Sequence, residues 1–393
     1  MRILHIIPYF YPAWAYGGTC RAAWELARAV ARHGHEVIAC TTDALDAYRR
    51  ANPSVEVVEG VEIHRAPNLS NRLAWSRLFI PLTFGRQLED ELRRADVVHL
   101  HEYRSFQDAV SLPMIERAGK PFILTAQGGV PLLVGRFVLK RVYDTLIGKR
   151  LLAKASRLHA LNTMEADQFV QAGGRREQIF IAPNGIQVSD FQNLPPADSQ
   201  AFRRKHNIPA HAPLVLFLAR INKIKGADFL VSAFAEMRRE LPQAVLVIAG
   251  PDDGYLPEVK RQIDSLGLAD SVRLIGYLDG TAKIEAYQAA GVYVLPSMYE
   301  ILGITLLEAL ACGVSVITTD RCGLADSIRQ NDLGAVVKFG DVTGLKDEIV
   351  RALKNPADAQ LVERRRNYVL KKFGWDAIAE RWVSVYQQCA ANT

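Results

Sequence analysis

Short apolar runs rich in β-branched residues alternate with amphipathic stretches of helical length along nearly the whole chain. Strands that alternate with helices of about 10–15 residues are typical of βαβ units, which assemble into parallel sheets. The alternation therefore predicts an α/β fold. We expect strands at 2–7, 36–41, 97–101, 122–125, 157–161, 214–219, 244–249, 272–275, 292–295, 314–318 and 335–337, a hairpin or two short strands at 55–65, and helices that include 20–32 and 227–240.

A proline-containing stretch separates this pattern into two sets of strands and helices. Residues 192–198 read Gln-Asn-Leu-Pro-Pro-Ala-Asp, a composition typical of a linker. A chain of 393 residues is also too long for a single hydrophobic core. We therefore expect two Rossmann-like, doubly wound domains, residues 1–190 and 191–374, facing each other across a deep cleft. Such domains bind ligands at the carboxyl ends of their strands.

The composition is that of a soluble globular protein, with 49% hydrophobic and 23% charged residues. No apolar run approaches the roughly 18–20 residues that cross a bilayer, and the apolar start of the chain is too short for a signal peptide. The five cysteines are scattered and form no Cys-x-x-Cys pair, which indicates reduced thiols. We therefore expect a cytoplasmic protein.

The sequence 300–308, Glu-Ile-Leu-Gly-Ile-Thr-Leu-Leu-Glu, joins an expected strand to a helix-like run at 306–312. A strand, a glycine-containing turn and a helix N-terminus form an anion site from backbone N–H groups and the helix dipole. Glu300 stands in the turn and Glu308 in the early helix, roughly 8–12 Å apart at the helical rise. This spacing suits hydroxyl groups on both sides of a bound diphosphate, as in a nucleotide sugar. An ordinary solvated helix start is the alternative.

Two cations follow the expected strand 214–219, in a loop that precedes a helix. Arg220 offers a planar fork and Lys225 a compact charge, and together they can neutralise a departing diphosphate. Solvated loop charges remain the alternative, above all for the lysine.

Consecutive glycines, Gly17 and Gly18, precede the expected helix 20–32 and allow a ligand to approach the backbone. They do not form the Gly-x-Gly-x-x-Gly dinucleotide motif. His101 and Glu102 lie at the end of one expected strand, and Gln127 and Gly128 at the end of the next. We expect His101 or Glu102 to contact an acceptor, with a hydrogen-bonded structural histidine as the alternative.

Lysine and arginine residues gather between positions 136 and 157, where apolar residues interleave with them at helical spacing. A basic amphipathic segment can lie on an anionic membrane or attract an anionic acceptor. A helix that faces the core and exposes a basic side is the alternative. The net charge of +6 adds to this basic character, and no nucleic-acid partner is expected.

No Asp-x-Asp triplet and no His/Cys cluster with zinc spacing occur in the sequence. We therefore expect no metal and no cofactor, so that Arg220, Lys225 and a helix N-terminus carry the charge of a leaving diphosphate.

Together these motifs resemble the retaining glycosyltransferases of family 4, which have two Rossmann-like domains in the GT-B arrangement. The resemblance extends nearly from end to end of the chain. Its motifs are the Gly17-Gly18 loop, 96–101, 183–185, Arg220 with Lys225-Gly226, Pro296-Ser297, Glu300-x7-Glu308 with 309–313, and 373–375.

The resemblance implies a role for each of these residues. Glu300 would bind the donor sugar and Glu308 the ribose, while Arg220 and Lys225 would hold the diphosphate. Backbone N–H groups would come from Gly18, Gly303, Ile304 and Thr305. Members of the family are typically metal-independent and retain the anomeric configuration by front-face attack. Their C-terminal helix, 375–393 here, commonly packs back on the N-terminal domain.

Gln127 departs from the family pattern, because many members carry a histidine at this position. Glutamine cannot accept a proton, so we expect Gln127 to form hydrogen bonds only. His101 then becomes the stronger candidate on the acceptor side, where Gly17, Glu102 and Gly128 are the other candidates.

The leading hypothesis is a transferase that moves a hexose from a UDP-sugar, favoured over a GDP-sugar, to a glycan or lipid-linked acceptor in cell-surface polysaccharide biosynthesis. Peripheral contact with the inner face of the membrane through 136–157 would fit a lipid-linked acceptor. A nucleotide-sugar epimerase of GT-B architecture is the alternative enzyme, disfavoured by the paired glutamates and cations. A non-catalytic protein that binds sugar nucleotides is the other alternative.

Overall fold

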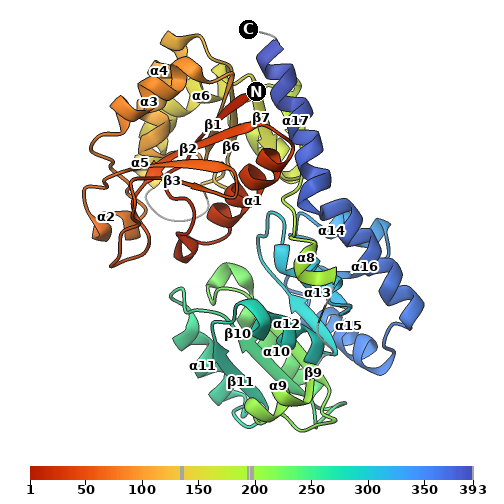
Figure 1. Cartoon of the computed structure of the whole chain (residues 1–393). Helices are drawn as coiled ribbons and strands as arrows, with labels where there is room; N and C mark the ends of the chain where they lie inside the picture. Colours follow the sequence, from red (N-terminus) through yellow and green to blue (C-terminus); the bar gives the residue numbers. More distant parts are fainter. Residues whose placement is uncertain (133–136, 193, 195–198, 392–393) are drawn as a thin grey trace. The chain divides into compact units, whose positions relative to one another are not determined.

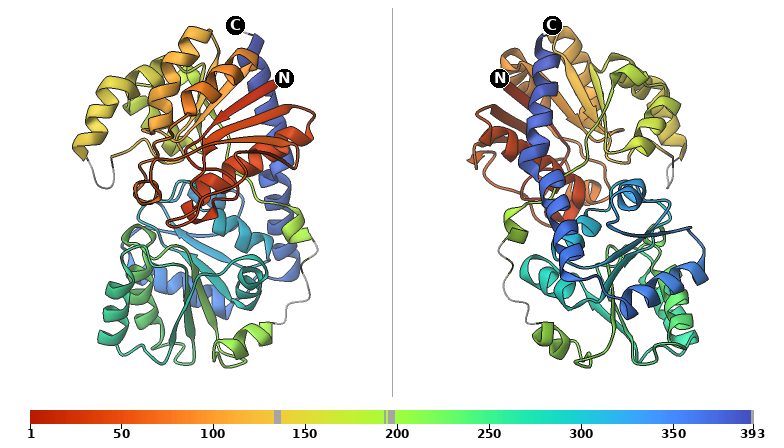
Figure 2. Two further views of the ribbon diagram at one scale, coloured as in Figure 1. Left: turned by 60° about the vertical axis from the view of Figure 1, so that its left-hand side comes forward. Right: turned by 90° about the vertical axis from the view of Figure 1, so that its right-hand side faces the viewer.

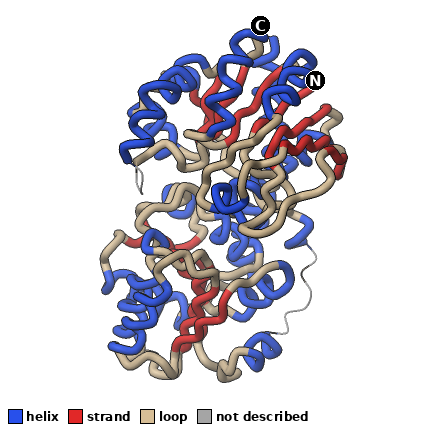
Figure 3. Tube along the Cα trace, turned by 90° about the vertical axis from the view of Figure 1, so that its left-hand side faces the viewer, coloured by secondary structure: helices blue, strands red, loops and turns tan. Residues whose placement is uncertain are grey.

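The computed structural model describes residues 1–132, 137–192, 194 and 199–391 (Figure 1). The chain divides into two compact units. Unit 1 comprises Met1–Gly185 together with the C-terminal stretch from Trp375, and unit 2 comprises Ile186–Gly374. In each unit the strands lie between helices (Figure 3). Among the described residues, no helix combines the length and the apolar character needed to cross a bilayer.

The sheet of unit 1 has eight strands in the order β3-β4-β2-β1-β5-β6-β7-β8. All neighbours are parallel except β3 and β4, which form an antiparallel hairpin. The strand order reverses direction between β1 and β5, the position at which doubly wound sheets bind ligands. The strands are β1 (Arg2–Ile6), β2 (Glu36–Thr42), β3 (Val55–Val58), β4 (Val61–Ala66), β5 (Val97–His101), β6 (Phe122–Thr125), β7 (Arg157–Ala160) and β8 (Ile179–Ile181).

Helices cover both faces of this sheet, which is why β1 and β5 are buried along their whole length. The helices of unit 1 are η1 (Trp14–Tyr16), α1 (Gly18–Arg32), α2 (Asn71–Trp75), α3 (Phe84–Arg94), α4 (Phe106–Ala118), α5 (Phe137–Tyr143), the π-helical turn η2 (Asp144–Gly148), α6 (Lys149–Lys154), α7 (Thr163–Gln171), η3 (Arg176–Gln178) and α17 (Trp375–Ala391).

Among the hydrophobic clusters of unit 1, the two largest lie on opposite sides of the sheet. On one side Leu88 of α3 and Leu112 of α4 pack against the strands. On the other side Ala27 of α1 packs with Trp382 of α17. The C-terminal helix therefore belongs to the core of unit 1, beside α1 (Figure 2).

The sheet of unit 2 has six strands, all parallel, in the order β11-β10-β9-β12-β13-β14. Its order reverses between β9 and β12. The elements are α8 (Ser189–Gln192), α9 (Ser199–Lys205), β9 (Leu214–Leu218), η4 (Lys223–Lys225), α10 (Ala227–Met237), β10 (Val245–Ala249), α11 (Leu256–Ser265), β11 (Val272–Gly276), α12 (Gly280–Ala289), β12 (Val292–Leu295), α13 (Ile304–Ala311), β13 (Val316–Thr319), α14 (Ala325–Gln330), β14 (Gly334–Val337), α15 (Val342–Lys354) and α16 (Ala359–Phe373).

These elements confirm the predicted α/β class with parallel sheets, and every predicted strand is present within a few residues. The prediction missed β8, a strand of three partly exposed residues at the sheet edge. The predicted boundary at 190 is five residues late, because Ile186 already pairs with Gly374 of unit 2 and donates to the Phe373 carbonyl. Of the predicted linker, positions 193 and 195–198 lie outside the described residues. The predicted cleft between the domains stays a prediction.

Candidate active site

The loop after β9 carries the two predicted cations and is shaped by local capping. The Asn222 side chain accepts from the Lys225 N–H at 3.2 Å, which closes the short helical turn η4. Gly226 then begins α10 with φ +74°. A Cβ atom at Gly226 would collide with the Pro296 carbonyl at the end of β12. Only glycine allows this close approach, which brings Lys225 beside the loop that follows β12.

That second loop runs from β12 to α13 and contains Glu300. Backbone hydrogen bonds join Glu300 to Arg321 and to Gly323, so the loop is held against the segment after β13. Gly303 precedes α13 in the left-handed conformation, with φ +78°. Glycine offers no side chain to cap the helix, so the first N–H groups of α13, at Ile304 and Thr305, suit an anionic ligand.

Glu300 and Lys225 form an ion pair across the two loops. The distance from Lys225 Nζ to Glu300 Oε2 is 2.5 Å, and the side chains are 19% and 14% exposed. The residues are 75 positions apart, and they meet because β9 and β12 are adjacent in the sheet. The structure therefore brings one predicted sugar-binding acid and one predicted phosphate-binding cation together.

Glu308 lies on α13 with both carboxylate oxygens engaged by α12. Lys283 Nζ lies 2.6 Å from Oε1, and the Tyr287 hydroxyl donates to Oε2 at 2.9 Å. The two partners are four residues apart and therefore share one face of α12. Burial and the neighbouring carboxylate raise the pKa of Tyr287 well above its usual range, which keeps its hydroxyl a donor.

Sequence reasoning did not identify Lys283 and Tyr287. Their only signal in the sequence is the Lys-x3-Tyr spacing in a helix before a buried strand, which is common in helices without any function. Tyr293 of β12 was missed as well. Its hydroxyl donates to the Leu218 carbonyl at 3.0 Å and lies 2.7 Å from Thr305 Oγ1, which links the end of β9 to the first turn of α13.

Arg220 is half exposed and pairs with Asp253, whereas Lys225 pairs with Glu300. Its guanidinium donates to Asp253 at 2.8 Å, and the Asn222 amide donates to the same carboxylate oxygen at 2.8 Å. Asp253 lies in the loop after β10. Arg220 is thus oriented by a neighbouring strand end, on the same edge of the sheet as Lys225.

The predicted residues of unit 1 lie around the carboxyl ends of β1, β5 and β6. Gly17 has φ +102° and caps α1, whose first residue Gly18 is exposed. Glu102 follows β5 with φ +74° and accepts a hydrogen bond from Tyr9. Burial raises the pKa of Glu102. The hydrogen bond from Tyr9 lowers it by a smaller amount, so the pKa stays above its usual value.

His101 is buried in a stack of rings instead of facing solvent. Its Nε2 lies 2.9 Å from His5 Nδ1, and its ring stacks on His99 with centroids 3.9 Å apart. Burial lowers the pKa of His101 well below its usual range, so the ring stays neutral. This placement supports the structural alternative and gives the side chain no surface on which to contact an acceptor.

The nitrogens of His5, His99 and His101 lie within 4.8 Å of one another, a grouping the sequence did not predict because His5 lies on a different strand. The geometry does not favour a metal. The rings of His5 and His101 are stacked, so their nitrogen lone pairs run parallel instead of converging on one ion. One nitrogen of each ring is also already used in the hydrogen bond between them. His99 is engaged at both nitrogens, by Tyr386 and Thr125 at 2.7 Å each.

The turn after β6 is held by hydrogen bonds to a buried acid, Glu165, which sequence reasoning missed. Gln127 and Gly128 both have positive φ, 47° and 83°. Glu165 accepts from the Gly128 N–H at 2.5 Å and from the Leu161 N–H at 2.8 Å. Burial raises the pKa of Glu165 to about 7, although both hydrogen bonds lower it. The half-buried Gln127 therefore stands on a rigid turn.

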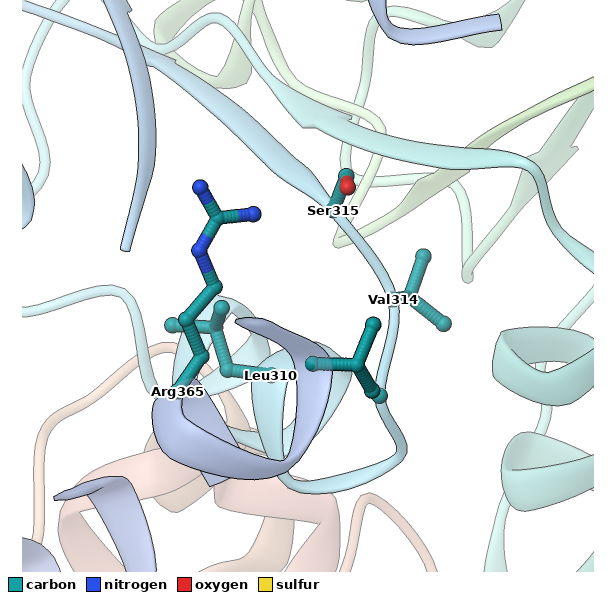
Figure 4. A pocket seen from close by; sticks show the side chains of 6 residues that line it. Leu310, Val314, Ser315 and Arg365 are labelled. Atoms are coloured by element: carbon teal, nitrogen blue, oxygen red, sulfur yellow. The ribbon is translucent and has the colours of Figure 1, made fainter. Parts of the chain in front are cut away.

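A small hollow lies at the other end of α13, lined by Leu310, Gly313, Val314, Ser315, Val362 and Arg365 (Figure 4). Arg365 is engaged there by hydrogen bonds to the carbonyl and side chain of Asp332. Because the hollow adjoins the C-terminal end of α13, it is separate from the N-terminus of that helix and from Glu300.

Comparison with known families gives two matches. Residues 17–185 match the glycosyl transferase 4-like domain, and residues 198–371 match the glycosyl transferases of group 1. The first match ends at the division between the units, and the second begins at residue 198. Together they cover most of the chain.

Relatives and solved structures agree with this result. An uncharacterized glycosyltransferase of Methanocaldococcus jannaschii is 27% identical over 97% of this chain and 97% of its own. A D-inositol 3-phosphate glycosyltransferase of Kineococcus radiotolerans is 29% identical over 94% of this chain and 89% of its own.

Among solved structures, HepE of Anabaena, crystallised with UDP and glucose, superposes with a TM-score of 0.77 over 99% of this chain and 100% of its own, at 17% identity. At this identity the likeness establishes the fold. The family matches and the fold together place this chain among the glycosyltransferases of the family 4 type, with the GT-B fold.

Proposed function

We propose that this glycosyltransferase transfers a hexose from a UDP-sugar, in preference to a GDP-sugar, to a glycan or lipid-linked acceptor of cell-surface polysaccharide biosynthesis. The transfer retains the anomeric configuration and needs no metal. The observation that carries the proposal is the pair of acid–cation contacts around the start of α13, Glu300 with Lys225 and Glu308 with Lys283.

The donor site in this proposal belongs to unit 2. The first N–H groups of α13, with Lys225 and Arg220, bind the diphosphate, because oriented dipoles and cations favour negative charge. Glu308 accepts from the ribose hydroxyls, and Lys283 and Tyr287 orient its carboxylate. Glu300 accepts from hydroxyls of the sugar. The UDP complex of HepE supports the choice of base.

In the proposed reaction the bond between the sugar carbon and the diphosphate oxygen breaks, and the acceptor oxygen bonds to the same face of the sugar. The departing diphosphate takes up the proton that the acceptor hydroxyl loses. Lys225 and the α13 N–H groups stabilise the charge that develops on the leaving group. Such a step requires no separate nucleophile on the protein, in agreement with the neutral, buried state of His101.

The residues of unit 1 supply the acceptor side in this proposal. Gln127, on its rigid turn, donates and accepts hydrogen bonds without exchanging a proton. Gly128 follows Gln127 in the same turn, and Gly17 and Glu102 are the other proposed acceptor residues. His101 contributes only by packing against His5 and His99 at the end of β5.

Calorimetric titration with UDP, GDP and ADP tests the donor side. We expect UDP to bind most tightly and Lys225→Met to weaken the binding. Incubation with a panel of UDP-sugars should then give slow hydrolysis, and the released sugar should keep its anomeric configuration by NMR. A folded protein that binds none of the nucleotides would refute the proposal. Conversion of a nucleotide sugar to its epimer without an acceptor would instead establish the epimerase.

A further inference from the structure

The helical segment 137–154, formed by α5, η2 and α6, presents an apolar stripe to solvent. Val138, Leu139, Val142 and Leu146 are 75%, 66%, 50% and 71% exposed. Positions 138, 142 and 146 follow each other at intervals of four, so they form one stripe along the helix, with Leu139 beside them. The alternative of a core-facing apolar side with a solvated basic side does not hold for these residues.

The opposite side of the segment already has its partners inside unit 1. Tyr143 and Ile147 pack against the hydrophobic core, and Leu151 and Leu152 are buried. The carboxylate of Asp144 accepts from Arg104 at 2.7 and 2.8 Å. The outward stripe is therefore a second apolar surface, additional to the one that attaches the segment to the fold. In Figure 2 the segment lies at the outer edge of unit 1.

The charges that flank the stripe are almost all positive. Arg141 and Lys149 are exposed beside it, and Lys140 and Lys154 lie on the same segment. The single acid, Asp144, is bound by Arg104, and Arg150 is paired with Glu116. Arg136, which the sequence assigned to this cluster, lies outside the described residues. An exposed apolar stripe with basic flanks is the pattern of a helix that lies in an anionic membrane interface.

We propose that segment 137–154 docks unit 1 on an anionic lipid bilayer, with Val138, Leu139, Val142 and Leu146 inserted below the headgroups. Charge complementarity favours this occupant. A second copy of the chain would place two basic flanks against each other, whereas anionic headgroups neutralise them.

Arg104 connects this surface to the candidate acceptor side. Besides Asp144 on the segment, its guanidinium donates to the carbonyls of Gly129 and Val130. These residues directly follow the Gln127–Gly128 turn. Docking thus holds the turn to the segment that contacts the lipid, and we infer from this link that the acceptor is lipid-linked; this part of the inference rests on the proposed function, whereas the docking itself does not.

Flotation with lipid vesicles tests the docking. We expect the wild type to float with vesicles that contain phosphatidylglycerol and not with pure phosphatidylcholine. The double variant Leu139→Gln/Leu146→Gln should lose at least about 90% of the bound fraction, and Arg141→Gln/Lys149→Gln should weaken binding and flatten its salt dependence. Leu266→Gln, at an exposed leucine of unit 2, is the control and should float like the wild type.

Two further measurements make each outcome decisive. UDP affinity and melting temperature should be unchanged in all variants. A variant that binds UDP like the wild type but does not float has then lost the docking and not the proposed donor site. A dye on Leu139→Cys should shift to the blue with anionic vesicles. Equal flotation of the wild type and Leu139→Gln/Leu146→Gln, or no flotation of either, would overturn the proposal. A dimer that this double variant abolishes would overturn it in favour of self-association.

Discussion

Replacement of Glu300 by glutamine should strengthen the binding of UDP while it weakens the transfer reaction. The carboxylate of Glu300 holds the ammonium of Lys225 at 2.5 Å, and the same ammonium is the proposed ligand of the diphosphate. Nucleotide binding must therefore compete with an existing ion pair. Glutamine has nearly the same shape as glutamate and no charge. The substitution therefore removes the competing carboxylate and leaves the volume of the side chain unchanged.

The structure sets the size of this effect. Exposed Lys–Glu pairs contribute up to about 1 kcal/mol, whereas breaking a buried pair costs about 3–5 kcal/mol. Side chains that are 19% and 14% exposed place this pair at about 1–2 kcal/mol, between those limits. Because an ammonium has three N–H donors and can share them, we expect UDP to bind about three- to tenfold more tightly. The gain should shrink as salt is raised.

Calorimetric titration of UDP measures this change, and a coupled assay with a UDP-sugar measures turnover, which should fall at least about tenfold. Glu240→Gln is the control, because Glu240 pairs with Lys346 elsewhere in unit 2 and its loss should leave the affinity for UDP unchanged. Weaker binding of UDP to Glu300→Gln than to the wild type would show that the carboxylate does not compete for Lys225, and the reasoning would fail.

The remaining predictions concern groups that only the structure brings to notice. Lys283→Met leaves Glu308 with Tyr287 as its partner and should weaken UDP binding about tenfold, with a smaller effect on kcat. Titration measures the binding and steady-state kinetics measure kcat. A change in kcat alone would contradict an orienting role for Lys283. Gly226→Val forces a β-branched residue into φ +74° and against the Pro296 carbonyl, and should destabilise the protein by about 2 kcal/mol or more in urea unfolding. Burial raises the pKa of Glu165 to about 7, above the roughly 4.3 of an exposed glutamate. The folded state therefore keeps a proton that the unfolded state loses, so this group makes wild-type stability fall as the pH rises from about 4.3 to 7, by about 3 kcal/mol. Urea unfolding of Glu165→Gln at pH 4.5 and 8 should lack this contribution, and equal pH dependence in both proteins would show that Glu165 does not titrate in that range.

The sequence by itself determined the fold class and the positions of most strands. Buried parallel strands are continuous apolar runs, and the helices between them have a period of 3.6 residues, so both signals are local. Local sequence also indicated where functional side chains would lie, since Arg220, Lys225 and Glu300 each follow an apolar run. Side chains at the carboxyl ends of parallel strands share one edge of the sheet whatever the strand order is.

Only the tertiary structure decided which of these groups meet. The pairing of Lys225 with Glu300 depends on β9 and β12 being neighbours, although two strands lie between them in the sequence. His101 has the same local signature as Glu102, yet it is buried because the ring of His5, from the neighbouring strand β1, stacks on it and bonds to it. The amphipathic pattern of segment 137–154 is equally compatible with an inward or an outward apolar side. Its orientation follows from long-range contacts, Asp144 with Arg104 and Ile147 with the core, because burial is a property of the packed fold and not of local spacing.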